Sequence, residues 1–138
     1  MKNLVVLLFL LSLQSILFAK NISLNVEVEG LKGEQGDLIV ALYNKDGSIP
    51  DEKLNKYFKK KVVPLSQLSK GIKFENLPEG RYAVIVIHDE NKNGKIDKGL
   101  ILPKEGVGFS NFKSISILNK PDFQKASFSL YDKDLTKK

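Results

Sequence analysis

The stretch RYAVIVIH, residues 81–88, is apolar on both faces of an extended chain. Residues 38–44, LIVALYN, have the same property. Residues 22–29, ISLNVEVE, instead alternate strictly between apolar and polar side chains, which is typical of a strand with one buried and one solvated face. A strand in a two-sheet protein normally carries polar residues on its outer face. The two doubly apolar strands therefore need a cover on their second face. We expect Val84 and Val86 on one face of residues 81–88 and Ile85 and Ile87 on the other, with all four side chains buried.

Shorter alternating runs occur in GIKFENL, KSISIL and KASFSLY, residues 71–77, 113–118 and 125–131. Clusters of Gly, Pro, Asn and Asp separate these runs, and no long helical period is present. The pattern predicts an all-β fold, an antiparallel Greek-key β-sandwich of the immunoglobulin or transthyretin-like kind, with about seven strands.

The insert at residues 45–70 is the candidate cover. It carries apolar side chains at helical i, i+3, i+4 spacing, namely Leu54, Tyr57 and Phe58. We expect one short amphipathic helix there, starting near Asp51, ending before Pro64 and lying over the sheet. The alternative is that a partner molecule covers this face.

The N-terminal end, residues 1–19, reads as an export signal. Its apolar run from residue 4 to residue 13 is too short to span about 30 Å of hydrocarbon. We expect cleavage after Ala19, an exported protein in the periplasm or the medium, and a single domain over residues 20–138 with no transmembrane segment. The chain has no cysteine, so packing, hydrogen bonds or an ion must hold this domain.

The chain is basic, with a formal net charge of +6. Arg81 is its one arginine, however, and export removes most nucleic acid from reach. We therefore interpret the lysine excess as a solvated surface that favours solubility, and we expect a monomer with no nucleic-acid partner.

Residues 89–97, DENKNGKID, resemble the front of a calcium loop. Oxygen-bearing side chains stand at its first, third, fifth and ninth positions, glycine at the sixth allows a sharp bend, and the seventh carbonyl adds an oxygen. The predicted ligands are Asp89, Asn91, Asn93, Lys95 through its carbonyl, and Asp97, with Ca2+ as the cation. The twelfth position is Leu100, where a full EF-hand has a bidentate glutamate, so Glu105 is a candidate replacement ligand.

The same residues also form a strong hairpin signal. Asn93 and Gly94 both tolerate positive φ, and the flanking acids and lysines keep such a turn hydrated. The two interpretations are compatible, because a loop that turns at Asn-Gly can also hold an ion.

His88 is the only histidine and directly precedes the acidic loop. We expect it to be a strand-end residue bonded to loop backbone. One alternative is a metal-dependent hydrolase that uses loop 88–97, with His88 as the base or as a residue that supports the metal site. Another is a catalytic pair of His88 with a nearby Ser110, although GFSN lacks the strand-turn-helix setting of a nucleophile elbow.

Two resemblances follow from longer runs. We expect the turn in FENLPEGRYAV, residues 74–84, to reverse the chain between two paired strands. It resembles the turn of transthyretin-like and carboxypeptidase-regulatory sandwich modules, which speaks to fold alone. The runs NLPEGRYAV, HDENKNGKID, PKEGVGFSN and KPDFQKASFSL together resemble domain of unknown function family 2141 over nearly the whole mature chain. That resemblance implies a small secreted or periplasmic bacterial domain. The chain departs from the family pattern between Asp97 and Pro103, where members often have a glycine before the proline.

The second family run, EGVGFSN, accompanies the acidic loop and is not explained by a turn alone. Glycines permit close backbone approach, and Ser and Asn offer donors and acceptors. The alternative is an ordered surface loop packed by Phe109. The expected ligand-contacting residues are His88, Glu105, Gly106, Gly108, Ser110 and Asn111.

The sequence as a whole indicates an exported, non-enzymatic binding or structural module with a calcium loop. Its partner would be a small-molecule or protein ligand that the sequence does not specify. A metal-dependent hydrolase and an envelope or adhesive module acting through the doubly apolar sheet are the alternatives.

Overall fold

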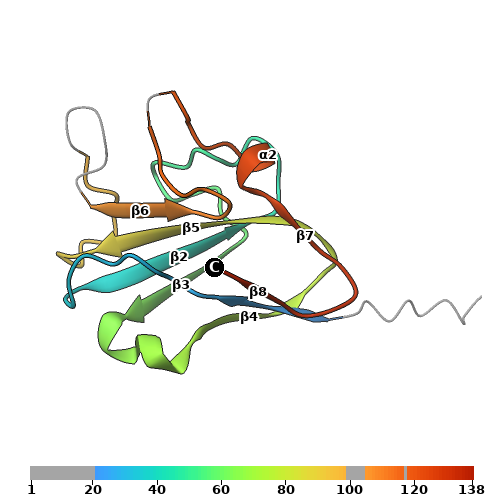
Figure 1. Ribbon diagram of the computed structural model, residues 1–138, viewed down its shortest axis with the longest axis horizontal. Helices are drawn as coiled ribbons and strands as arrows, with labels where there is room; N and C mark the ends of the chain where they lie inside the picture. The colour runs from blue at the N-terminus through green and yellow to red at the C-terminus, as the bar shows by residue number, and fades with distance from the viewer. Residues whose placement is uncertain (1–20, 99–104, 117) are drawn as a thin grey trace, which may run out of the picture.

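The computed structural model describes residues 21–98, 105–116 and 118–138 (Figure 1). The segment 1–19, which the sequence predicts to be an export signal, and Pro103 lie outside these residues. The described part is an all-β structure with eight strands in two sheets. The strands are β1 Ile22–Val26, β2 Asp37–Tyr43, β3 Lys59–Pro64, β4 Ile72–Leu77, β5 Gly80–Asp89, β6 Gly106–Phe109, β7 Phe128–Leu130 and β8 Leu135–Lys137, and the helices are the 3-10 helix η2 Leu65–Lys70 and the short α2 Phe123–Ala126.

One sheet has the order β4-β1-β8, and the other has the order β3-β2-β5-β6, with β7 also paired to β5. The pairs are antiparallel except for β1 and β8, which run parallel. The expectation of about seven purely antiparallel strands was therefore wrong in this detail. Among the helices that the structure describes, none is long and apolar enough to cross a membrane.

The two doubly apolar strands, β2 and β5, are neighbours at the centre of the larger sheet. The side chains of Leu38, Val40 and Leu42 face the smaller sheet and pack with those of β1 and β4. The odd-numbered side chains of β2 pack on the opposite face with those of Ile85 and Ile87. Each strand thus supplies two separate apolar clusters, as its sequence predicts.

The cover over the second face comes from two segments far apart in the sequence. Ile49, Leu54 and Tyr57 from the insert pack there beside Phe123 and Ala126 of α2. Figure 1 shows both segments on the side of the larger sheet away from β4, β1 and β8. The chain's own residues occupy this face, so it is not available to a partner in this structure.

The helix expected between Asp51 and Pro64 is not formed. Residues 59–64, KKKVVP, make strand β3 instead, paired with β2 along its whole length. The β-branched Val62 and Val63 favour a strand, and pairing with β2 adds backbone hydrogen bonds that an isolated short helix would lack. The lysines of β3 lie on an open edge, where charge hinders pairing with another molecule. The helix that does occur in the insert, η2, follows Pro64.

Three smaller expectations also need correction. The turn at Pro78 joins β4 to β5, which lie in different sheets, whereas we expected it between paired strands. It is held by a 2.6 Å hydrogen bond from Tyr82 Oη to the carbonyl oxygen of Pro78. The run KSISIL forms no strand over its described residues 113–116. Val86 was expected to be fully buried but is only half-buried, because it faces a groove described below.

Candidate functional site

The acidic loop begins where β5 ends, and its first acid organises it. Asp89 is 2% exposed. Its Oδ1 accepts the backbone N–H of Asn93 at 3.0 Å, and its Oδ2 accepts the backbone N–H of Gly94 at 2.8 Å. The carboxylate therefore folds the loop back onto the strand end, since charged acceptors make strong hydrogen bonds to N–H groups.

The other oxygen-bearing side chains converge on Asp97. Asn91 Nδ2 donates to Asp97 Oδ2 at 2.6 Å, and Asn93 Nδ2 donates to Asp97 Oδ1 at 2.9 Å. The amide oxygens turn the other way: that of Asn91 accepts the N–H of Asn93 at 3.1 Å, and that of Asn93 accepts the N–H of Lys95 at 2.8 Å. These two bonds are local Asx turns. The structure thus brings together the side chains of four of the five predicted metal residues.

Residues outside the loop fix its position. Asp37 on β2 is the register partner of Asp89, and Lys92 Nζ lies 3.1 Å from Asp37 Oδ1. Gly36 passes so close that a Cβ there would meet the carbonyl oxygen of Asp89 at 2.4 Å.

Within the loop, the left-handed residues are Lys92 (φ 58°) and Gly94 (φ 71°). Asn93, the expected partner of Gly94 in a tight turn, keeps negative φ.

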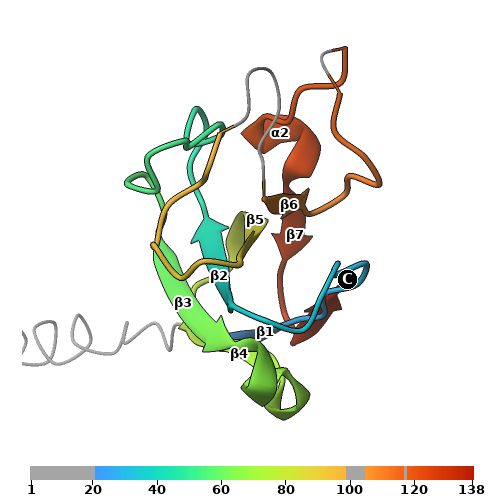
Figure 2. The ribbon, with the colours of Figure 1, turned by 90° about the vertical axis from the view of Figure 1, so that its left-hand side faces the viewer.

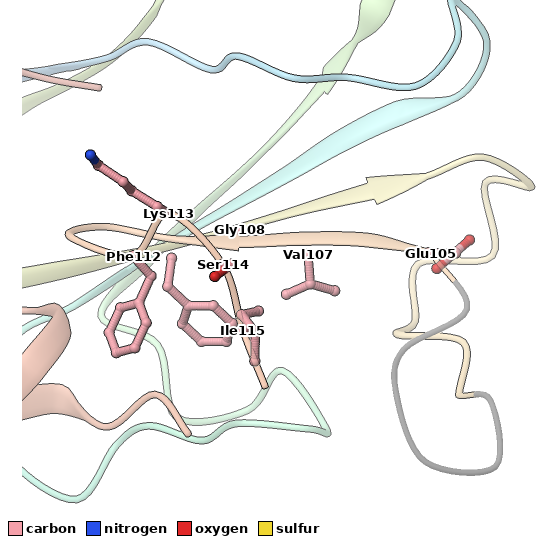
Figure 3. A pocket seen from close by; sticks show the side chains of 8 residues that line it. Glu105, Val107, Gly108, Phe112, Lys113, Ser114 and Ile115 are labelled. Carbon is pink, nitrogen blue, oxygen red and sulfur yellow. The ribbon is translucent and has the colours of Figure 1, made fainter. Parts of the chain in front are cut away.

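Glu105 reaches the loop from the start of β6 (Figure 3), as the candidate replacement ligand should. Its Oε2 accepts the backbone N–H of Asp97 at 3.2 Å. Its Oε1 is buried and has no hydrogen-bond partner among the described residues. A buried carboxylate oxygen without a donor is costly, and a cation would offset that cost.

A metal site built only from acids and histidine is not present in the described ranges. No three His, Cys, Asp or Glu side chains group there closely enough to hold an ion. A cation at this loop would therefore need the amide oxygens of Asn91 and Asn93 and backbone carbonyls beside the carboxylates. Calcium accepts that mixture of oxygens.

His88 behaves as the sequence predicts for a strand-end histidine. It is 3% exposed, and its Nε2 lies 2.7 Å from the carbonyl oxygen of Gln35, to which it donates. Ser110 is not beside it. The Ser110 N–H bonds to Val84, four residues back along β5 and roughly 13 Å away at the usual rise per strand residue. The alternative in which His88 and Ser110 form a catalytic pair is therefore wrong.

Ser110 and Asn111 instead tie the end of β6 to α2. The Ser110 hydroxyl donates to the carbonyl oxygen of Ala126 at 2.6 Å and accepts the N–H of Val84 at 2.9 Å. Asn111 Nδ2 donates to the carbonyl oxygen of Ser127 at 2.9 Å. Both side chains have a structural role in these contacts.

The run EGVGFSN contains an edge strand, β6, and not a loop. Val107 and Phe109 pack against the covered face, whereas Gly106 and Gly108 pair with His88 and Val86 on the side facing the smaller sheet. These glycines line a groove, together with residues that sequence reasoning missed, including Phe112 and Lys113. The sequence signal that could have predicted this groove is the presence of glycine at alternate positions of a run that otherwise has the pattern of a strand.

The comparisons with known proteins agree with the order of the sequence runs. The model of the family described as "uncharacterized protein conserved in bacteria", domain of unknown function 2141, matches residues 26–138. No curated protein and no solved structure shows significant similarity to the chain. The match begins at the end of β1 and extends through the acidic loop, the glycine run and α2 to the last residue. The chain therefore belongs to the bacterial family of domain of unknown function 2141.

Proposed function

We propose that this protein is an exported, non-enzymatic binding module whose loop 89–97 binds calcium, with Glu105 completing the ligand set. The observation that carries the proposal is the meeting of Glu105 with Asp97 at one end of the loop. Glu105 has a buried oxygen without a hydrogen-bond partner among the described residues. A buried carboxylate oxygen without a donor, held against a loop that already contains Asp89 and Asp97, favours a divalent cation there.

The hydrogen bonds around Asp97 suggest how the cation would enter. The side-chain amide N–H groups of Asn91 and Asn93 direct their partial positive charge at the Asp97 carboxylate. A cation bound beside this carboxylate would replace these N–H groups as the source of positive charge. Both amides would then rotate to present their oxygens, giving up the two Asx-turn bonds. Magnesium should bind more weakly, because it demands a tight octahedral geometry and keeps its waters.

The test is a comparison of melting temperatures in calcium and in chelator. A site with a dissociation constant of about 0.1 mM stabilises the folded state by roughly 1.4 kcal/mol at ~1 mM calcium, if only the folded state binds. For a domain of this size that corresponds to about 3–6 °C. Isothermal titration with calcium should show one site of the same affinity.

Glu105→Gln separates a ligand from a structural residue. In chelator, one buried oxygen of the Glu105 carboxylate has no partner among the described residues. The glutamine variant removes this buried charge, so its melting temperature in chelator should equal or exceed that of the wild-type protein. In calcium the variant should lose most of the shift. Glu90→Gln is the matched control, because Glu90 is an exposed acid of the same loop at a position that does not converge on Asp97. It should keep the calcium shift.

The calcium proposal would be contradicted if the wild-type protein melted at the same temperature in calcium and in chelator, and if titration with calcium to a concentration of about 5 mM released no heat. The loop would then be only a hairpin turn. Loss of the shift in both glutamate variants would show general charge attraction and no defined site.

The export and the sandwich type belong to the same proposal. Export is supported by the apolar segment at residues 4–13. A Greek-key arrangement of the immunoglobulin or transthyretin-like type is supported by the contact of β2 with β5, which are not consecutive, and by the passage from β4 to β5 between sheets.

A further inference from the structure

The sandwich is closed on one side and open on the other. On the closed side, η2 connects β3 of the larger sheet to β4 of the smaller sheet (Figure 2). On the open side, the edge strands β6 and β8 belong to different sheets and are not paired with each other. Two adjoining hollows of about 600 and 610 Å³ lie along this side and share Val86, Gly108 and Lys113. Together they form what we term the seam groove, and each hollow is within the size range of small-molecule sites.

The seam groove exists because β6 presents no side chain to it. Gly106 and Gly108 point toward the smaller sheet, as do their register partners His88 and Val86. Neither glycine has positive φ, a Cβ at Gly108 would meet nothing within 4 Å, and one at Gly106 would make only ordinary contact at 3.5 Å. Backbone conformation and close packing therefore do not require glycine here. Larger residues would fill the groove.

The floor of the seam groove is apolar. Val26 and Val28 contribute from β1 and the segment after it, and Val84 and Val86 contribute from β5. Val86 is left half-buried although it lies on a central strand. A ligand with an aliphatic part would bury the apolar surface of Val86, which the glycines of β6 leave exposed.

Acids and lysines are balanced along the whole rim, with Glu90 and Glu105 at one end, but lysines outnumber acids at the end beside β8. Lys113 lines both hollows, and its side chain extends to the opposite side of β6 from those of Phe112 and Ile115 (Figure 3). Its ammonium makes no ion pair among the residues that the structure describes. The nearby acid Glu29 is already paired, with its Oε1 2.6 Å from Lys138 Nζ. Lys137 lines the same hollow.

We propose that the seam groove binds an aliphatic carboxylate of medium chain length. The alkyl chain lies on the valines, and the carboxylate pairs with Lys113. The basic character of the whole chain favours such an anion. One hollow of the groove shares Glu105 with the calcium proposal, so all measurements below are made in chelator, where the two proposals can fail separately.

Isothermal titration with decanoate below its micellar concentration is the direct test, with decyltrimethylammonium as a probe of the same chain and opposite charge. Decanoate should bind at one site, and the cationic probe should bind more weakly. Lys113→Gln should weaken decanoate binding about two- to fivefold, which is the range for a solvent-accessible ion pair. Lys60→Gln removes the same charge from β3 at the far edge and should leave binding unchanged.

Substitutions at Gly108 test whether decanoate binds in the seam groove. Gly108→Ala adds a methyl group in open space, and Gly108→Leu fills the groove. Both should fold with a melting temperature at or above that of the wild-type protein, because glycine is unfavourable within a strand. The leucine variant should lose at least about tenfold in affinity, and the alanine variant less.

Three results would overturn the proposal. They are no decanoate binding by the wild-type protein, equal binding of the two probes, and unchanged binding by a folded Gly108→Leu variant.

Discussion

Tyr43 Oη donates a 3.0 Å hydrogen bond to Asp51 Oδ2 in the protein interior. The same carboxylate accepts the backbone N–H groups of Asn55 at 3.1 Å and Lys56 at 2.8 Å. A side chain on the covered face of β2 is thus bonded to the acid that folds the covering loop. This contact joins the central strand to the insert where the sequence had predicted a helix.

Tyr43→Phe removes the hydroxyl while keeping the ring. Asp51 is 3% exposed and would lose one of its three donors. The expected cost is ~1.5–3 kcal/mol of unfolding free energy, as for hydrogen bonds to charged groups. Urea denaturation followed by circular dichroism measures it. A loss under about 0.5 kcal/mol would contradict a role for the contact in holding the cover.

Alkaline pH should act through the same pair. Burial, and then the hydrogen bond to the Asp51 carboxylate, raise the pKa of Tyr43 well above its ordinary value of 10.0. A group whose folded pKa is raised contributes stability that is complete below its unfolded pKa and declines above it. The wild-type protein should therefore lose stability above about pH 10. Tyr43→Phe should show a shallower decline, and identical slopes in the two proteins would contradict the assignment.

Ile85→Ala tests the central position of β5. Ile85 is 2% exposed and packs in the covered cluster with Ala41 and Phe123. Truncation should cost about 2–5 kcal/mol. Val62→Ala on the edge strand β3 is the control, because Val62 is 54% exposed and should cost about 0.5 kcal/mol or less. Similar losses at both positions would mean that β5 is not central.

Gly36 and Gly33 form a matched pair. Both have positive φ, 97° and 116°, but a Cβ at Gly36 would meet the Asp89 carbonyl oxygen at 2.4 Å, while one at Gly33 meets nothing within 4 Å. Gly33→Ala should cost ~1–2 kcal/mol from backbone strain alone. Gly36→Ala should cost more than about 3 kcal/mol, because backbone atoms must move. Equal costs, measured by thermal melting, would contradict the close approach of the segment to the acidic loop.

Processing is tested by intact mass. We expect exported material to begin at or near Lys20, since the signal segment reads as cleaved after Ala19. Retention of residues 1–19 in the exported protein would contradict this.

Local pattern predicted much of the fold. Strict alternation at residues 22–29 and double apolarity at 38–44 and 81–88 indicated β1, β2 and β5, because side chains of a strand alternate between faces. The acids and amides of loop 89–97 likewise close on one another within nine residues, so their spacing was informative. His88 at the strand end followed from the same local reasoning.

The remaining features depended on partners distant in sequence. The sequence of residues 59–64 is compatible with the end of a helix and with a strand. The segment forms strand β3 because it pairs with the open edge of β2. The parallel pairing of Leu24 with Leu135 joins opposite ends of the chain, which no local pattern encodes. Gly106 and Gly108 looked like a loop until pairing with β5 made them a strand.

The candidate sites divide in the same way. The sequence determined which oxygens surround the acidic loop, because neighbouring residues supply them. Only the tertiary structure decided that Glu105 reaches Asp97, which depends on the pairing of β6 with β5, and that β6 and β8 leave a groove between them, which depends on how one sheet is placed against the other. Side-chain packing and backbone pairing over long sequence separations, and not composition, determine that placement.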